Sequence, residues 1–275
     1  MLSMLVFLLI LASSFLFAML GLGGGMVYVP ILKWAGLDYK TVVIPLGLLL
    51  NGLNTLLALI PYHRSRLVDY HGAWPMGVAA MLFAPLGALT TAYVPKDTLV
   101  VLFAVAVLAA AFKVLWDLHK AWSPATQAAT DTATTLESQV VGIRAENGFP
   151  RLSRQSRRMV WSGSAGAFIG FIGGMLGVGG GFVVGPLLMS MGYPPKQAAA
   201  TTAFVVTFSS FSGYLGHTLG GHTFNGVTIL TILAVILGSQ AGGYFMAHKA
   251  KPQWVKLIYG IVLVMIAVKL MLEAI

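Results

Sequence analysis

Cysteine is absent from this 275-residue chain, and charged residues are scarce. Without thiols, the chain can form neither a disulfide nor a metal site with thiolate ligands. Charged residues make up 9% of the sequence, whereas an average soluble domain has roughly 25%. Only eight residues are acidic. These shortages exclude a soluble domain of ordinary composition and indicate apolar surroundings.

Hydrophobic residues make up 57% of the chain and gather in long runs. A run of about 20 apolar residues is long enough to cross a bilayer as a helix, so we expect an all-α, polytopic membrane protein. The run from Leu2 to Leu20 has no basic residue before it and no small-residue cleavage pattern after it, so we interpret it as a membrane helix and not as a signal peptide. The runs cover residues 3–20, 41–60, 73–94, 97–118, 159–176, 197–216, 227–246 and 254–272.

The chain repeats itself at an offset of 156 residues. This shift superimposes two glycine-rich stretches, "AMLGLGGGMVYVP" and "GMLGVGGGFVVGP", without a gap. It also pairs Gly87 with Gly243, so the duplication extends beyond the glycines. We therefore predict two membrane repeats, residues 1–118 and 159–275. Residues 119–158 between them are rich in Ala, Thr, Ser and Arg, and we expect a flexible connector.

The number of crossings in each half decides how the halves are related. Four crossings per half make the repeats parallel, and five make them inverted. With five, twelve Lys and Arg residues fall on one side of the membrane and three on the other, whereas four crossings give eight against seven. The positive-inside rule favours the larger asymmetry. We predict two inverted repeats of about five membrane segments each, with both termini outside and the 119–158 connector in the cytoplasm.

Each glycine stretch must interrupt the crossing that it contributes. The apolar segment 26–35, at 1.5 Å per residue, reaches only about half a bilayer as a helix. Short Gly/Pro-interrupted segments at matching positions in two halves indicate a transporter binding site. Glycine accepts positive φ, and the half-helix after it offers N–H groups and partial positive charge, so we predict an anion site. The candidate ligands are Gly23, Gly24, Gly25, Gly179, Gly180 and Gly181.

Glycines can instead serve close helix packing alone. We favour that interpretation for Gly163, Gly166, Gly170 and Gly174, which are spaced three or four residues apart. The glycine triplets exceed any need of packing, so we interpret them as lining a site.

Neutral polar residues follow each short segment in otherwise apolar runs. The 156-residue shift aligns Asn51 with Thr207 and Asn54 with Ser210. A single hydroxyl in a helix often bonds only to its own backbone, but an aligned set in both halves favours a shared site. The candidate side chains are Asn51, Asn54, Thr201, Thr202, Thr207 and Ser210.

Asp and Glu are missing from the interiors of the apolar runs; Asp97 and Asp117 lie at run edges. A carboxylate proton relay or cation site within the membrane is therefore not expected. The six histidines lie in loops or at run ends without metal-ligand spacing, so we predict no metal and no cofactor. The basic residues lie in short loops, where membrane orientation is the usual cause, and we expect no nucleic-acid partner.

The glycine motifs resemble those of the sulfite exporter TauE/SafE family, also called the 4-toluene sulfonate uptake permease family. The resemblance rests on G-x-GGG-x-x-x-x-P-x-L in both halves and on "MGYPPKQAAATTAFV", and it covers nearly the whole chain except 119–158. It implies transport of small sulfur-containing anions, such as sulfite, sulfonates or sulfoacetate, across the bacterial inner membrane. The first half departs from the usual pattern by placing Pro45 where the second half has Thr201, which leaves the substrate open.

These observations predict a secondary transporter in the lipid bilayer that moves a small organosulfur or inorganic sulfur anion by alternating access. A passive anion channel is the alternative, since its sequence features would overlap. The chain shows no paired carboxylates or spaced histidines of a catalytic site, so we do not expect an enzyme. A coupling ion and a homodimer are left open.

Overall fold

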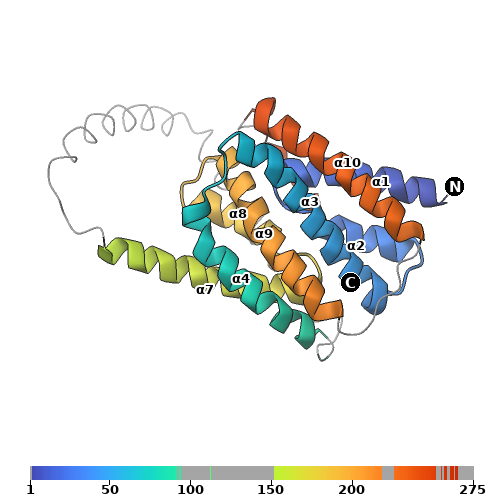
Figure 1. Ribbon diagram of the computed structural model, residues 1–275, viewed down its shortest axis with the longest axis horizontal. Helices are drawn as coiled ribbons and strands as arrows, with labels where there is room; N and C mark the ends of the chain where they lie inside the picture. The colour runs from blue at the N-terminus through green and yellow to red at the C-terminus, as the bar shows by residue number, and fades with distance from the viewer. Residues whose placement is uncertain are drawn as a thin grey trace.

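The computed structural model describes residues 2–91, 93, 112, 152–218, 226–251, 255, 257–258, 261–262 and 264–265. All secondary structure in these residues is helical, which confirms the predicted all-α class. All of the predicted run 97–118 except residue 112, most of 254–272 and most of the 119–158 connector lie outside the described residues. The elements (Figure 1) are α1 (Leu2–Leu20), α2 (Gly25–Trp34), the π-helical turn η1 (Tyr39–Val43), α3 (Ile44–Arg64), α4 (Tyr70–Thr90), α7 (Leu152–Leu176), α8 (Gly181–Ser190), α9 (Pro195–Thr218) and α10 (Gly226–His248).

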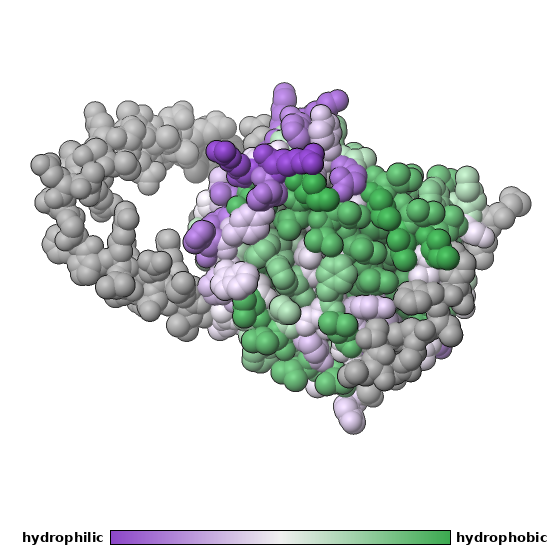
Figure 2. All heavy atoms as spheres, viewed as in Figure 1, coloured by the Kyte–Doolittle hydropathy of each residue, from purple (hydrophilic) through white to green (hydrophobic). Residues whose placement is uncertain are grey.

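Five of the described helices are long and apolar enough to cross a membrane: α1, α3, α4, α9 and α10. Many large apolar side chains on their outer faces are exposed, including Leu82 and Ile229 at more than half of their surface. Figure 2 shows apolar side chains over most of the visible helical face, with hydrophilic side chains gathered at one end. A protein surface of this kind fits lipid, because exposed apolar area of this extent is rare in soluble proteins.

Helices of one half pack on helices of the other in matched pairs. α1 packs against α10 and α7 packs against α4, and the 156-residue shift converts one pair into the other. α3 packs against α9, its own counterpart, while α4 also packs on α9 and α10 on α3. The repeat in the sequence is therefore matched by a repeat in the packing.

Glycines allow the backbones of these pairs to touch. A Cβ built on Gly170 of α7 would lie 2.4 Å from the carbonyl oxygen of Ala80 on α4, and Gly166 and Gly174 face Met76 and Ala84 in the same way. The packing interpretation is confirmed for these three glycines. For Gly163 it is not confirmed, because no described residue lies within 4 Å of a Cβ built there.

On α10, Gly242 has the same relation to Phe15 of α1, with a built Cβ 2.1 Å from that carbonyl oxygen. The pairs α4–α7 and α1–α10 are thus both packed closely through glycines. Close backbone contact through small residues is the usual means of helix association in membranes.

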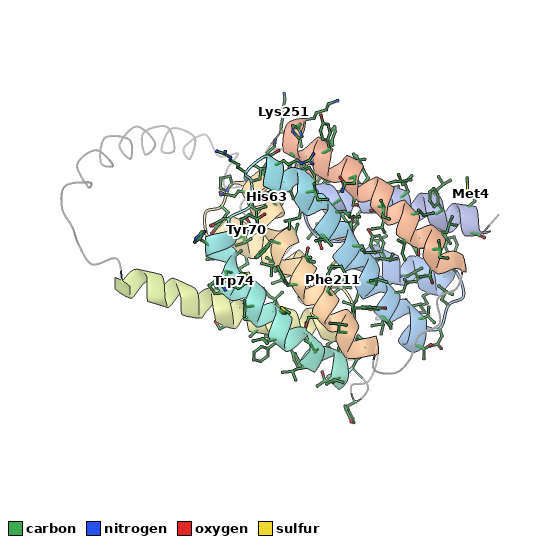
Figure 3. The ribbon with its side chains drawn as sticks, in the orientation of Figure 1. Met4, His63, Tyr70, Trp74, Phe211 and Lys251 are labelled. Atoms are coloured by element: carbon green, nitrogen blue, oxygen red, sulfur yellow. The ribbon has the colours of Figure 1, made fainter. Side chains whose placement is uncertain are left out.

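Equivalent helices run in opposite directions (Figure 1): α1, α3 and α10 run from right to left, whereas α7, α9 and α4 run from left to right. The basic ends agree with this arrangement. Lys196 Nζ lies 3.4 Å from the carbonyl oxygen of Ala247 at the end of α10, and Figure 3 shows Lys251 and His63 at one end of the molecule with Met4 at the other. Inverted repeats of about five membrane segments each would place the helices in this way, and this relation between the halves stays a prediction.

Helix α7 begins at Leu152, inside the range that we expected to belong to the connector. The stretch "LSRQSRR" contains no Gly or Pro, and Leu, Arg and Gln are good helix formers, so nothing separates it from the apolar run that follows. The polar composition that predicts a connector does not prevent helix formation here.

Candidate anion-binding site

The two glycine stretches are turns that break the chain between a long helix and a short one. α1 ends at Leu20 and α2 begins at Gly25, and in the second half α7 ends at Leu176 and α8 begins at Gly181. Each turn holds glycines in the left-handed region, which L side chains rarely adopt. Their φ values are 69° at Gly21, 92° at Gly23, 90° at Gly24, 74° at Gly177, 68° at Gly179 and 75° at Gly180.

The predicted interruption is therefore present in both halves. α2 and α8 have ten residues each, which gives each of them a length of about 15 Å, or half a bilayer. Gly24 and Gly180 are the N-cap residues of α2 and α8, and neither of them provides a side-chain hydrogen bond to cap its helix. Each short helix thus begins at a glycine in the left-handed conformation.

The two turns touch each other inside the protein. A Cβ built on Gly25 would lie 3.0 Å from the Cα of Val178, and a Cβ built on Gly181 would lie 2.5 Å from the carbonyl oxygen of Leu22. The 156-residue shift converts each of these contacts into the other, so the two turns contact each other through equivalent residues. The N-termini of α2 and α8, each with partial positive charge, therefore converge on one buried point.

Asn51 of α3 lies at this point and is fully buried. Its Oδ1 accepts a hydrogen bond of 2.7 Å from the backbone N–H of Gly25. Its Nδ2 donates to Ser210 Oγ at 2.7 Å and to the carbonyl oxygen of Val178 at 3.3 Å. One carboxamide thus joins the first glycine turn, the second glycine turn and α9.

Asn54 supports the first turn from the next helical turn of α3. Its Nδ2 donates to the carbonyl oxygen of Gly23 at 2.7 Å, and its Oδ1 accepts from Ser14 Oγ at 2.9 Å. In the second half, Ser209 donates to the carbonyl oxygen of Gly179 at 2.7 Å. In each turn, a backbone carbonyl oxygen therefore accepts a hydrogen bond from a polar side chain of the next long helix, α3 in the first half and α9 in the second.

Thr207 belongs to the same buried layer. Its hydroxyl lies 2.9 Å from Thr55 Oγ1 of α3 and 2.7 Å from the carbonyl oxygen of Ala203. Asn51, Thr207 and Ser210 of the aligned set thus take part in hydrogen bonds between α3 and α9. Asn54 instead bonds to the first glycine turn and to Ser14 of α1.

Thr201 and Thr202 are placed differently. Thr201 Oγ1 accepts from the backbone N–H of Asp69 at 3.1 Å, near the start of α4. It precedes Thr207 by six residues, about 9 Å along the helix. Thr202 is fully buried, and its hydroxyl has no hydrogen-bond partner in the part of the chain that the structure describes. Neither side chain joins the hydrogen bonds around Asn51.

Residues that the sequence analysis missed complete the site. Ser14 of α1, Thr55 of α3 and Ser209 of α9 are buried and bonded to members of the set. Tyr28 of α2 is fully buried and lies over Gly24, where a built Cβ would be 2.7 Å from the phenolic oxygen. The signal for Ser14 was available, because it is a hydroxyl residue in an apolar run close to the glycine stretch.

The chemistry of the site is neutral. Among the described residues, no buried side chain carries a charge, and no group of His, Cys, Asp or Glu could hold a metal ion. The donors that converge here are amides and hydroxyls, which together with two helix N-termini suit an anion and give a cation no carboxylate ligand. The expected open amides are not all open, since Asn51 occupies the N–H of Gly25.

Comparison with known proteins shows the family to which the chain is similar. The sequence profile of the family described as Sulfite exporter TauE/SafE matches residues 5–270. The chain is 28% identical over 277 residues to the probable membrane transporter protein YunE of Bacillus subtilis, covering 94% of this chain and 93% of that protein. A probable membrane transporter protein of Methanocaldococcus jannaschii is 22% identical over 261 residues, which cover 90% of this chain and 86% of that protein.

A plant protein shares a shorter segment. Sulfite exporter TauE/SafE family protein 3 of Arabidopsis thaliana is 51% identical over 45 residues, which are 16% of this chain and 10% of the plant protein. No solved structure matches the chain.

Proposed function

The chain belongs to the sulfite exporter TauE/SafE family of membrane transporters, and from that premise we propose that it is a secondary transporter for a small sulfur-containing anion. The anion would bind where the N-termini of α2 and α8 converge, next to Asn51. We propose Gly23, Gly24, Gly25, Gly179, Gly180 and Gly181 as the backbone of the site and Asn51, Asn54, Thr207 and Ser210 as its polar side chains.

The observation that carries the proposal is the position of the Asn51 carboxamide. Its oxygen accepts from the N–H of Gly25, at the N-terminus of a half-helix inside the protein. An oxygen of sulfite or a sulfonate has the same hydrogen-bonding capacity and carries negative charge, so it would replace Asn51 Oδ1 at this donor with a stronger, charge-assisted bond. Because the same Asn51 amide group also reaches Val178 and Ser210, its displacement would loosen the contact between the halves.

Alternating access would follow from this coupling. In transporters built from inverted repeats, one half rocks against the other around a fixed site near the bilayer midplane. We propose the paired turns and the α3–α9 contact as the pivot of this motion. We also propose a bacterial inner membrane location with a cytoplasmic connector, and we leave a coupling ion and a homodimer to direct measurement.

Transport by the purified protein in liposomes tests the proposal. Uptake of labelled sulfite, thiosulfate, sulfoacetate and sulfate is measured with and without the same unlabelled anion preloaded inside, and protein-free liposomes are the control. We expect saturable uptake of at least one sulfur anion and acceleration by preloading. Flux that neither saturates nor responds to preloading would instead identify a passive anion channel, and no flux of any of the four would contradict the proposal.

A further inference from the structure

Tyr28 of α2 has a buried hydroxyl next to the first glycine turn. The side chain is fully buried in α2, and its phenolic oxygen has no hydrogen-bond partner among the described residues. The side chain of Ser14 lies close to this hydroxyl, but the pair does not meet the geometry of a hydrogen bond. Ser14 also has its own acceptors, Asn54 Oδ1 at 2.9 Å and the carbonyl oxygen of Val235 at 3.1 Å.

An orphaned hydroxyl of this kind costs stability, because burial removes its hydrogen bonds to water without replacing them. Native proteins rarely retain such a group without a reason such as a role in ligand binding. Its counterpart under the 156-residue shift is Val184, an apolar residue, so the fold does not require a hydroxyl at this position. The hydroxyl is therefore specific to the first half of the molecule.

The position of the phenol ties it to the glycine turn. Side chains of a helix lean toward its N-terminus, so Tyr28 lies over the residue one turn earlier. That residue is Gly24, the N-cap of α2, where a built Cβ would lie 2.7 Å from the hydroxyl oxygen and 2.6 Å from the ring carbon that bears it. The neighbouring Gly23 and Gly25 face Asn51, with built Cβ atoms 2.3 Å and 3.1 Å from its Oδ1. The phenol and the carboxamide thus contact one tripeptide.

We propose that Tyr28 is a specificity-determining ligand of the transported anion, to which its hydroxyl donates a hydrogen bond; this inference rests on the proposed function. The anion would present one oxygen to the N–H of Gly25 in place of Asn51 Oδ1 and a second oxygen to Tyr28. Two acceptor oxygens on one sulfur centre can satisfy both donors, whereas a monatomic anion has a single centre. The site therefore selects sulfur oxyanions, with sulfite, sulfonate or sulfate groups, over chloride.

The substitution Tyr28→Phe tests the proposal, with Tyr62→Phe as a matched control. Tyr62 is also fully buried, but its hydroxyl donates to the carbonyl oxygen of Ala18, a structural hydrogen bond. Each variant is purified and measured in two ways: the midpoint of thermal unfolding by intrinsic tryptophan fluorescence without anion, and the KM for sulfite or sulfoacetate uptake into liposomes. The wild-type protein is measured beside both, with unlabelled chloride and sulfate as competitors.

For Tyr28→Phe we expect an unfolding midpoint equal to or above that of the wild type, because no hydrogen bond is lost. We expect its KM to rise about tenfold, as for the loss of one charge-assisted bond, and its selectivity against chloride to fall. Tyr62→Phe should show the reverse, a lower midpoint and an unchanged KM. A KM of Tyr28→Phe within twofold of the wild type, or a midpoint lowered as much as in Tyr62→Phe, would overturn the ligand role. Failure of the wild type to transport any of the anions would instead contradict the proposed function itself, and with it any ligand role.

Discussion

Asn51 Nδ2 lies 2.7 Å from Ser210 Oγ, and this buried hydrogen bond joins the third helix of one half to its counterpart in the other. The oxygen of the same carboxamide accepts from Gly25. A single neutral side chain therefore connects a half-helix N-terminus to the interface between the repeats. Any ligand that competes for the Gly25 N–H also acts on the contact between α3 and α9.

Removal of this carboxamide should abolish transport and weaken the fold. In Asn51→Leu, the N–H of Gly25, the carbonyl oxygen of Val178 and the hydroxyl of Ser210 each lose a partner. We expect a loss of stability on the order of 3 kcal/mol and at least a tenfold loss of uptake. Thermal unfolding and initial uptake rates in liposomes measure the two effects.

Gln240→Leu is the control for a partly buried, hydrogen-bonded amide outside the site. Gln240 Nε2 donates to the carbonyl oxygen of Leu57 at 3.0 Å, which ties α10 to α3. Its loss should lower stability by about 1 kcal/mol without changing KM. If Asn51→Leu transported the anion with the wild-type KM, Asn51 would be a structural residue like Gln240.

The sequence predicts the broken crossings and the aligned polar set because both follow from local chemistry and the repeat. Gly24 and Gly180 mark the starts of α2 and α8, and Asn51 and Asn54, three residues apart, share one helix face. The same helical periodicity explains why Thr201 and Thr202 do not join the hydrogen bonds around Asn51. At 100° per residue, Thr201 and Thr202 point to other faces of α9 than Thr207, whereas Ser210 lies close to it.

Other features depend on distances that no sequence pattern contains. The hydrogen bond from Gly25 to Asn51 requires the approach of α3 to the turn, which packing of the whole half determines. In the sequence, nothing distinguishes Tyr28 from any other aromatic residue of a short apolar segment. Its burial, and the lack of a hydrogen-bond partner for its hydroxyl among the described residues, are known only from the structure. The sequence therefore indicates which residues form the candidate site, but it does not reveal which hydrogen-bonding groups of that site are already paired with one another.

The glycine turns should not tolerate a methyl group. In Gly24→Ala and Gly180→Ala, the new Cβ would lie 2.6 Å from the Tyr28 ring and 2.5 Å from Ile169 Cγ2, in a backbone conformation with positive φ. We expect a loss of more than about 2 kcal/mol in stability, from strain and crowding together, and loss of transport. Monodispersity on gel filtration, thermal unfolding and uptake are the measurements.

Gly36→Ala and Gly192→Ala separate strain from crowding. Both glycines have positive φ, 83° and 93°, but a Cβ built on either meets nothing within 4 Å. These variants should lose only about 1 kcal/mol and should keep wild-type transport. If all four alanine variants lost the same amount of stability and transport, crowding at Gly24 and Gly180 would have no effect of its own. The left-handed backbone conformation that the four glycines share would then explain the losses.

The three glycines of α7 that face α4, Gly166, Gly170 and Gly174, should be needed for packing of the two halves and not for anion binding. In Gly170→Ala, a Cβ 2.4 Å from the carbonyl oxygen of Ala80 forces α7 away from α4. We expect a destabilisation of about 2 kcal/mol with an unchanged KM for the protein that remains folded.

Gly163→Ala is the matched change on the same helix, because none of the residues that the structure describes lies within 4 Å of its built Cβ. It should be neutral or stabilising by up to about 1 kcal/mol, the ordinary preference of a helix for alanine over glycine. Unfolding midpoints for the two variants that agree within error would contradict the contact between α7 and α4.

Cysteine labelling can determine whether the repeats are inverted, and the absence of native cysteine removes any background. Arg64, Lys251 and Trp34 are exposed residues at helix ends, so single cysteines there should react with a membrane-impermeant thiol reagent. Five crossings per half place positions 64 and 251 on one side of the membrane and position 34 on the other. Four crossings place 251 with 34 and opposite 64.

Labelling is compared between intact cells and inverted membrane vesicles, and each variant is first tested for wild-type transport. We expect Trp34→Cys to react in intact cells, and Arg64→Cys and Lys251→Cys to react only in inverted vesicles, because basic loops remain inside. Reaction of positions 251 and 34 from the same side would make the halves parallel. The N-termini of α2 and α8 could then not approach one point from opposite faces of the bilayer, and the proposed anion site would lose its basis.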